Sequence, residues 1–355
     1  MKVAVLEYLS GGGLSDEKVS TSLRHEGMAM LSALANDLVQ CGHQVHTCLD
    51  RQASQLSDPL VDNVRIHEIP PANLSWSNKW DEIAHACDRT IVIAPELAHQ
   101  LEQIVERLRS AGSVVVASSK EFLRATSDKL VTAELLSKSH VAHPSTCTLS
   151  QFLKDPENTI SPSPVTVKRR DGAGCADMKY FDNPRLFSNW LSQPNRRDLN
   201  CDDWIVQPWL AGRPASIAIL ASEQWHVLSA VEQFIQLEPS DSGDGSSDVI
   251  YVGGSGPLRA VTREQLEQLA KKVRAALPLG AYGWIGIDFL VPVSSPELVV
   301  IEVNPRLTTS YLGYRKWYGH KLANALLADG DCNSIASQFN ATLPLHEYTK
   351  WGVDL

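Results

Sequence analysis

Three oxygen-bearing side chains lie in two apolar segments in the last quarter of the sequence, and their types suit a metal ion. Residues 284–291 and 298–304 are rich in apolar, largely β-branched residues, and the turn between them is rich in Pro and Ser, which predicts a β-hairpin. Since residues two apart share a face of a strand, Glu302 and Asn304 point the same way, and Asp288 falls almost opposite Glu302. Facing carboxylates repel each other unless a cation lies between them. Oxygen ligands predict Mg²⁺ or Mn²⁺.

The residues after this hairpin extend the same interpretation. Pro305 ends the second strand and Arg306 follows it, so the guanidinium would lie beside the metal and meet a developing anion. The alternative is that these are ordinary polar residues at a strand end exposed to water, as single charged residues usually are. The convergence of three donors at this spacing favours a site.

Lys129 is the first of two lysines whose positions suit phosphate binding. Residues 126–138 predict a helix with Thr126 or Ser127 as its N-cap. Lys129 then lies in the first helical turn, where the helix dipole disfavours a cation and a bound polyanion would reverse that preference. The alternative for Lys129 taken alone is a solvated surface lysine.

Lys168 is the second lysine, and a glycine-containing loop follows it. Residues 165–168 predict a strand, and residues 169–175 read Arg-Arg-Asp-Gly-Ala-Gly-Cys. Backbone amides of such a loop can cover phosphate oxygens. Gly-x-Gly alone is more often a plain hairpin turn, but its position next to Lys168, Arg169 and Arg170 favours a phosphate-covering lid.

Residues 204–210, Trp-Ile-Val-Gln-Pro-Trp-Leu, form an apolar segment that contains a proline. Proline has no N–H, so the segment is not expected to be a fully paired central strand. It suits a crossover between two subdomains. The carbonyl of Pro208 and the N–H of Leu210 would then be available to pair with a purine ring.

The elements that position these residues begin with an α/β pattern. Residues 2–8 predict a strand, residues 22–40 an amphipathic helix and residues 45–49 a second strand, which together form a βαβ unit with a parallel sheet. The pattern continues with a strand, a helix and a strand at residues 91–94, 97–111 and 113–117.

A glycine loop follows the first strand. Ser10, Gly11, Gly12 and Gly13 match neither GxGxxG nor GxxxxGK[ST], so a dinucleotide site or a P-loop is excluded here. One interpretation is a tight turn that needs positive φ. The other is substrate binding at the carboxyl end of a strand, the usual place in open α/β sheets, with Glu26 of the next helix serving the same substrate.

The remaining elements carry fewer chemical signals. Residues 239–248 are rich in Ser, Gly and Asp and predict a loop. Thr262 and Gln265 predict a capping box at the start of a helix. The expected elements of this region are a strand, its hairpin partner and two helices, at residues 215–221, 225–235, 262–277 and 321–328.

Composition argues against several kinds of partner and cellular compartment. The net charge is −9, from 32 basic and 41 acidic residues, which argues against a nucleic-acid partner. No apolar run approaches the ~20 residues of a membrane helix. Seven cysteines, an odd number with no CxxC pair, argue against a zinc or disulfide framework and favour a cytoplasmic protein.

The order of these motifs resembles the ATP-grasp superfamily. That series is a lysine at a helix start, a lysine before a glycine loop, an interdomain strand and then Asp…Glu-x-Asn-Pro-Arg, and it covers roughly residues 118–315. The resemblance implies an ATP-grasp fold of mixed α/β and α+β class, in which a parallel-sheet domain precedes two α+β subdomains that grip the nucleotide. The expected ranges are residues 1–117, 118–207 and 208–355.

The resemblance also implies roles for individual residues. Lys129 and Lys168 would contact ATP phosphates, Arg306 and Lys168 would act on the transferring phosphoryl group, and the ribose contact is unassigned because residues 212–216 carry no glutamate. The implied Mg²⁺ or Mn²⁺ ligands are Asp288, Glu302 and Asn304. The implied lid is Gly172, Ala173 and Gly174, and the implied adenine segment is Gln207, Pro208, Trp209 and Leu210.

A narrower likeness is to the tyramine–glutamate ligase group of methanofuran biosynthesis, which serves one-carbon metabolism. It rests on residues 7–13, 26–31, 251–254 and 302–310. This resemblance implies an ATP-dependent carboxylate–amine ligase that forms an amide through an acyl phosphate, with small-molecule carboxylate and amine substrates. A homodimer is the default expectation.

Three rival functions remain open from the sequence. One is a nucleotide-binding regulatory or scaffolding protein without ligase activity. Another is a different ATP-grasp reaction, such as carboxylation or plain phosphorylation. The third, a nicotinamide oxidoreductase built on the first domain, is disfavoured by the missing GxGxxG.

Overall fold

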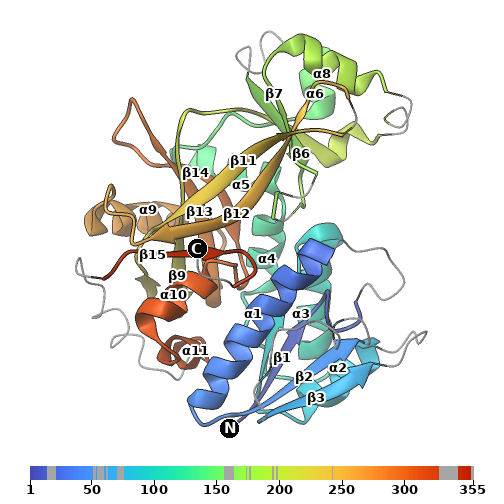
Figure 1. The fold of residues 1–355 in the computed structure, drawn as a ribbon, viewed down its shortest axis with the longest axis vertical. Coiled ribbons are helices and arrows are strands. Elements are labelled where there is room, and N and C mark those ends of the chain that lie inside the picture. The colour runs from blue at the N-terminus through green and yellow to red at the C-terminus, as the bar shows by residue number, and fades with distance from the viewer. Residues whose placement is uncertain are drawn as a thin grey trace.

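The chain folds around two β-sheets, drawn as a ribbon in Figure 1. The computed structural model describes residues 1–13, 21–50, 53, 60, 63–69, 76–155, 164–172, 174–175, 177–193, 196, 199–241, 243–327 and 343–352. The smaller sheet belongs to the first part of the chain and lies at the bottom of Figure 1. The larger sheet carries the rest.

In the described part of the N-terminal domain, the sheet has four parallel strands in the order β3-β2-β1-β4. β1 (Lys2–Glu7) pairs in parallel with β2 (Gln44–Asp50) and β4 (Arg89–Ile93), and β2 pairs in parallel with β3 (Val64–Ile69). The helices of this part are α1 (Thr21–Gln40), α2 (Trp76–His85), the 3₁₀ helix η2 (Leu97–His99) and α3 (Gln100–Ser110). The predicted βαβ unit is confirmed.

Two details of this domain differ from the sequence prediction. The strand expected at residues 113–117 is reduced to a single bridge between Thr90 and Val115. Strand β3 was not predicted, because it is an edge strand whose sequence, VRIHEI, exposes three of its six residues and so lacks an apolar run. An apolar run indicates burial but does not say how many neighbours a strand will have.

The larger sheet has eleven strands among the residues that the structure describes. β10 (Trp225–Val227) pairs with β9, and β15 (His346–Thr349) pairs with β12, so the expected single strand at residues 225–235 is two strands. The path of the sheet is β14 (Val299–Asn304), β13 (Gly283–Pro292), β9 (Gly212–Ala221), β11 (Val231–Pro239), β12 (Ser247–Gly256), β7 (Lys179–Phe181), β6 (Val165–Arg169), β8 (Trp204–Pro208) and β5 (Cys147–Thr148).

Helices flank this sheet, and their caps were predicted in one case and not in another. Thr262 and Gln265 form the expected capping box of α9. The N-cap of α5 is Asp128, not Thr126 or Ser127, because those two residues end the preceding helix α4. The helices are α4 (Lys120–Ser127), α5 (Lys129–Lys138), α6 (Leu149–Lys154), α8 (Pro184–Leu191), α9 (Arg263–Ala276), α10 (Tyr311–Tyr318), α11 (Lys321–Ala325) and the 3₁₀ helix η4 (Cys201–Asp203).

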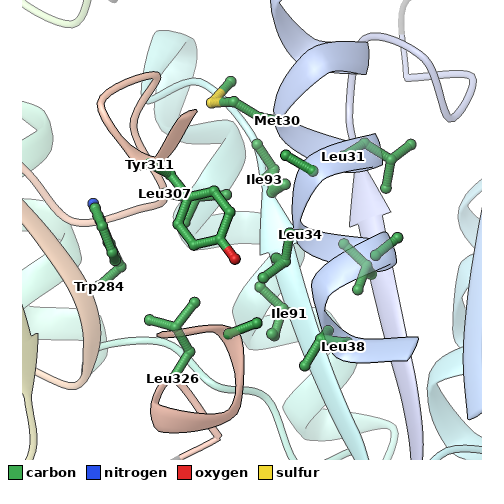
Figure 2. Packing of buried hydrophobic residues seen from close by; sticks show 14 of the residues in the cluster. Met30, Leu31, Leu34, Leu38, Ile91, Ile93, Trp284, Leu307, Tyr311 and Leu326 are labelled. Atoms are coloured by element: carbon green, nitrogen blue, oxygen red, sulfur yellow. The ribbon is translucent and has the colours of Figure 1, made fainter. Parts of the chain in front are cut away.

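One hydrophobic core joins the N-terminal domain to the end of the chain. Figure 2 shows Leu34 and Leu38 of α1 beside Ile91 of β4, with Tyr311 of α10 and Leu326 approaching from the other side. These side chains are buried. Helix α1 therefore packs on its own sheet and on the C-terminal helices, which fixes the N-terminal domain against the larger sheet.

No helix of the described part of the chain combines the length and the apolar character that crossing a membrane requires. The division of the chain into residues 1–117, 118–207 and 208–355 stays a prediction.

Candidate active site

A cavity of about 400 Å³ is bordered by the larger sheet, by the connection from β6 to β7 and by α1. Most of the residues singled out in the sequence line it. They are Glu26, Lys129, Lys168, Gly172, Gly174, Gln207, Pro208, Trp209, Leu210, Asp288, Glu302, Asn304 and Arg306. Ala173 lies outside the described residues. Elements distant in sequence thus converge on one space.

The hairpin of β13 and β14 holds its three polar side chains together, as predicted. In the antiparallel register Asp288 is opposite Glu302, and Gly286 is opposite Asn304. The side-chain Nδ2 of Asn304 donates to Asp288 Oδ2 at 3.2 Å and to Glu302 Oε1 at 3.3 Å. Gln233 of β11 also donates to Asp288 Oδ1, at 3.1 Å.

The two carboxylates perturb each other. Burial, followed by the charge of Glu302, raises the pKa of Asp288. Burial also acts to raise the pKa of Glu302, but Lys129 and Lys168 outweigh it and hold that pKa below its usual range. The pair thus concentrates negative charge in a buried place, which a cation would neutralise.

This donor set fits Mg²⁺ or Mn²⁺. Two carboxylates and one amide group point into a cavity, and hard divalent cations take oxygen ligands of these types. The set contains only two carboxylates, and the described part of the chain has no cluster of three or more His, Cys, Asp or Glu residues that could hold a metal instead. A site with only three protein ligands leaves positions for phosphate oxygens and water, as Mg²⁺ sites usually do.

The two lysines lie against this hairpin. Lys129 Nζ is 3.4 Å from Glu302 Oε2 and donates to the carbonyl of Gly172. Lys168 is 5% exposed, and burial lowers its pKa against the opposing charge of Glu302. Both lysines therefore line the cavity near the two carboxylates. A bound polyanion would be stabilised there by the charges of both ammonium groups.

The arginines next to the glycine loop have partners of their own. Arg169 Nε is 3.0 Å from Asp171 Oδ1, and Arg170 Nη2 is 2.5 Å from Asp128 Oδ2. The amide of Lys129 donates to the carbonyl of Arg170 at 2.9 Å. Arg170 thus ties the base of the loop to the N-cap of helix α5, whereas Arg169 pairs within the loop and lines the cavity beside Lys129 and Lys168.

The segment predicted to hold adenine leaves the sheet where β8 ends at Pro208. Strand β8 lies between β6 and the two-residue β5, so it is next to the edge of the sheet. The amide of Trp209 donates to the carbonyl of Pro164 at 2.8 Å. Apolar residues that were not predicted also line the cavity: Met178, Ile235, Val249, Phe289, Leu290 and Ile301. They are suited to cover a planar ring.

Arg306 lines the cavity and is oriented by Glu96, a residue that was not predicted. Arg306 Nε donates to Glu96 Oε1 at 2.9 Å and to Oε2 at 3.1 Å. Glu96 is 3% exposed and follows β4 at the carboxyl end of the N-terminal sheet. The rule that sites form at carboxyl ends of parallel strands would have pointed to it.

The glycine loop is not among the described residues that line this cavity, and its assignment to the substrate stays a prediction. The amide of Ser10 donates to Glu7 Oε2 at 2.6 Å, and those of Gly11 and Gly13 donate to the carbonyls of Glu7 and Tyr8. A Cβ on Gly11 would lie 2.5 Å from the carbonyl oxygen of Glu7. The loop, with Gly12 at φ 92°, is thus a tight structural turn. Of the described residues predicted to bind substrate, Glu26 of α1 is the one that lines the cavity.

Comparisons with known proteins agree with this geometry. A family model described as an ATP-grasp domain matches residues 126–310, and one described as a pre ATP-grasp 3 domain matches residues 43–121. The tyramine–L-glutamate ligase of Methanocaldococcus fervens is 21% identical over 318 residues, covering 88% of this chain and 89% of its own.

Solved structures share the fold. An ATP-grasp superfamily protein from Archaeoglobus fulgidus superposes with a TM-score of 0.69 at 19% identity, covering 98% of this chain and 92% of its own. The N5-carboxyaminoimidazole synthetase of Staphylococcus aureus, solved with ADP, has a TM-score of 0.61 at 14% identity, covering 87% and 72%.

Proposed function

The chain belongs to the ATP-grasp family, and from this we propose that it is an ATP-dependent carboxylate–amine ligase. The family and the fold are those that the motifs resembled. The observation that carries the proposal is the convergence of Lys129, Lys168, Asp288 and Glu302 in one cavity. Such a cavity binds a metal–nucleotide complex and holds its phosphates next to a second substrate.

In this proposal the nucleotide is held by three groups of residues. Lys129 and Lys168 contact the phosphates, Gly172 and Gly174 cover them, and the segment from Gln207 to Leu210 contacts adenine. Asp288, Glu302 and Asn304 would hold Mg²⁺, which neutralises charge on the phosphates when it is bound. The charges of the lysines and of Arg306 support in-line transfer, which requires positioning more than acid–base groups.

The proposed reaction has two steps. A substrate carboxylate oxygen attacks the γ-phosphorus of ATP, the bond to the β-phosphate oxygen breaks, and ADP leaves with both electrons of that bond. An amine nitrogen then attacks the acyl phosphate carbon, the carbon–oxygen bond breaks, phosphate leaves, and the nitrogen loses a proton. Arg306, held by Glu96, is placed to stabilise the negative oxygen formed in the second step.

We also propose that the substrates resemble those in the relative's name, a carboxylate of the glutamate type and a primary amine. The alignment with that relative covers 88% of this chain and 89% of the relative, which supports a related pair of substrates. The product would be an amide of the kind used to build methanofuran-type one-carbon cofactors.

A screen of substrate pairs tests the function. Purified protein is incubated with Mg-ATP, one carboxylate and one amine, and phosphate release is followed, with mass spectrometry of any product. We expect phosphate release to need both substrates, and the product mass to equal the sum of both minus water. A phosphorylated or carboxylated product, or nucleotide binding without release, would replace ligation by a rival function.

A further inference from the structure

We propose that Glu26 binds an ammonium group carried by one of the two substrates. This inference rests on the proposed function and names the chemical class of group that the cavity selects. The ammonium group belongs either to the carboxylate substrate, as in an amino acid, or to the attacking amine. Both sources present the same cation to the same carboxylate.

The first support is that Glu26 lines the cavity without a partner. Glu26 is partly exposed, and no hydrogen bond or ion pair joins its side chain to another described residue, whereas each buried carboxylate among the described residues of the N-terminal domain has one. The paired carboxylates and their partners are Glu7 with the amides of Leu9 and Ser10, Asp37 with Arg315, Asp50 with Arg24, Glu96 with Arg306, and Glu102 with Arg124.

The second support is the charge around Glu26. Burial raises the pKa of its carboxyl group, and the positive charges of Lys350 and Arg306 oppose that shift. Arg306 already forms an ion pair with Glu96 at 2.9 Å. Neither cation forms an ion pair with Glu26, and a carboxylate withdrawn from water without a direct partner is costly to folding, so a cationic ligand would supply the direct contact that the described residues do not.

The third support is the way in which α1 places this residue. The neighbouring Gly27 packs against the end of β1, since a Cβ there would lie 2.7 Å from the Glu7 carboxyl carbon. The Glu7 carboxylate is itself fixed by the amides of Leu9 and Ser10 at 3.0 and 2.6 Å. The glycine turn therefore serves the cavity indirectly, because it anchors the strand end on which the Glu26 segment rests.

The experiment measures binding, so that it does not depend on turnover. Calorimetry with Mg-ADP-loaded protein uses L-glutamate, glutarate, which lacks the ammonium group, and tyramine. If the carboxylate substrate carries the cation, wild-type protein prefers glutamate to glutarate and Glu26→Gln removes that preference. If the amine carries it, Glu26→Gln weakens tyramine binding instead. Either loss should be about 30-fold or more, as for a buried charge pair that loses one partner.

Controls separate this role from a structural one. Glu26→Asp should restore part of the affinity, because the charge remains, and Mg-ADP affinity should change less than about 2-fold in both variants. Glu297→Gln, on the exposed hairpin turn, should behave as wild type. Thermal unfolding checks that each variant is folded. In turnover assays with a substrate pair from the screen, KM for the ammonium substrate rises while KM for ATP stays constant.

Some results would overturn the proposal. They are unchanged affinity for both ammonium probes in Glu26→Gln, or no affinity for either probe in wild-type protein that binds Mg-ADP. Binding that depends on Glu26 in a protein that forms no amide with any pair would refute ligation but keep the ammonium site.

Discussion

At the scale of a single residue, Asp288 lowers the stability of the folded protein but would provide a ligand for a metal cation. Its carboxylate faces that of Glu302 in register, and the neutral donors of Asn304, Gln233 and Ser216 lie against it. Without a cation, this like-charge contact weakens the folded state. Active-site groups of this kind are places where substitution commonly stabilises a protein at the expense of its function.

The first prediction is that Asp288→Asn unfolds at a higher temperature than wild type in metal-free buffer. Removing one charge of the repelling pair should raise Tm by about 1–2 °C, equivalent to about 1 kcal/mol for a chain of 355 residues. Adding Mg²⁺ with nucleotide should then stabilise wild type but not the variant. Scanning calorimetry with and without chelator measures both. A lower Tm for the metal-free variant would contradict the repulsion argument.

The second prediction concerns Lys168 and Glu302. Lys168→Ala should lower kcat about 10²–10³-fold, the usual effect of losing one donor that stabilises developing charge. Glu302→Ala should abolish amide formation, because it also removes the partner of Lys129. Circular dichroism should show both variants folded. Near-normal turnover in either variant would argue against the assignment of the site.

At the scale of the element, Asp128 joins a helix start to the loop over the cavity. Its side chain accepts from the amides of Leu130 and Val131 at 2.9 and 3.3 Å, and it forms the ion pair with Arg170. One residue thus fixes both the first turn of α5, which carries Lys129, and the base of the glycine loop.

The third prediction separates these two roles. Asp128→Asn keeps an acceptor for the helix amides but loses the charge that holds Arg170, so ATP binding should weaken while stability changes by less than about 0.5 kcal/mol. Asp128→Ala should lose both, with a stability cost of about 1 kcal/mol. The cap variant Thr262→Ala, on α9 and outside the cavity, should lower stability by a similar amount and leave the KM for ATP unchanged.

At the scale of the whole molecule, the N-terminal domain is fixed by α1. The apolar side of this helix shares a core with α10 and α11. A polar contact reinforces it, since Asp37 accepts from Tyr311 Oη at 2.7 Å and from Arg315 Nε at 2.8 Å. Because Glu26 lies on the same helix, this packing also sets where the proposed ammonium site stands relative to the hairpin.

The fourth prediction is that Asp37→Ala destabilises the protein by about 3 kcal/mol, because it leaves a buried tyrosine hydroxyl and a partly buried arginine without their acceptor. Urea denaturation measures the loss. The control, Glu267→Ala, breaks the exposed pair with Arg263 and should cost less than about 0.5 kcal/mol. Equal effects from the two changes would show that the contact at Asp37 contributes no more than a surface pair.

Local patterns predicted those features that depend on neighbours in sequence. The period-two spacing of the hairpin placed Asp288 opposite Glu302, and the capping signature placed the start of α9. The same reasoning chose the wrong cap for α5, because Thr126 and Ser127 have cap-like side chains but belong to the helix before. The C-terminal strand β15 was missed, since only its pairing with β12 makes it a strand.

The amino-acid sequence alone determined the types and spacing of the chemical groups, because short-range geometry fixes which side chains share a strand face or a helix turn. Tertiary structure decided which of them meet. It turned the glycine loop into a structural turn, paired Arg306 with Glu96 across 210 positions, and brought Glu26 to the cavity. Such contacts arise only when sheets and helices distant in the chain bury their apolar faces together, and no local pattern records that packing.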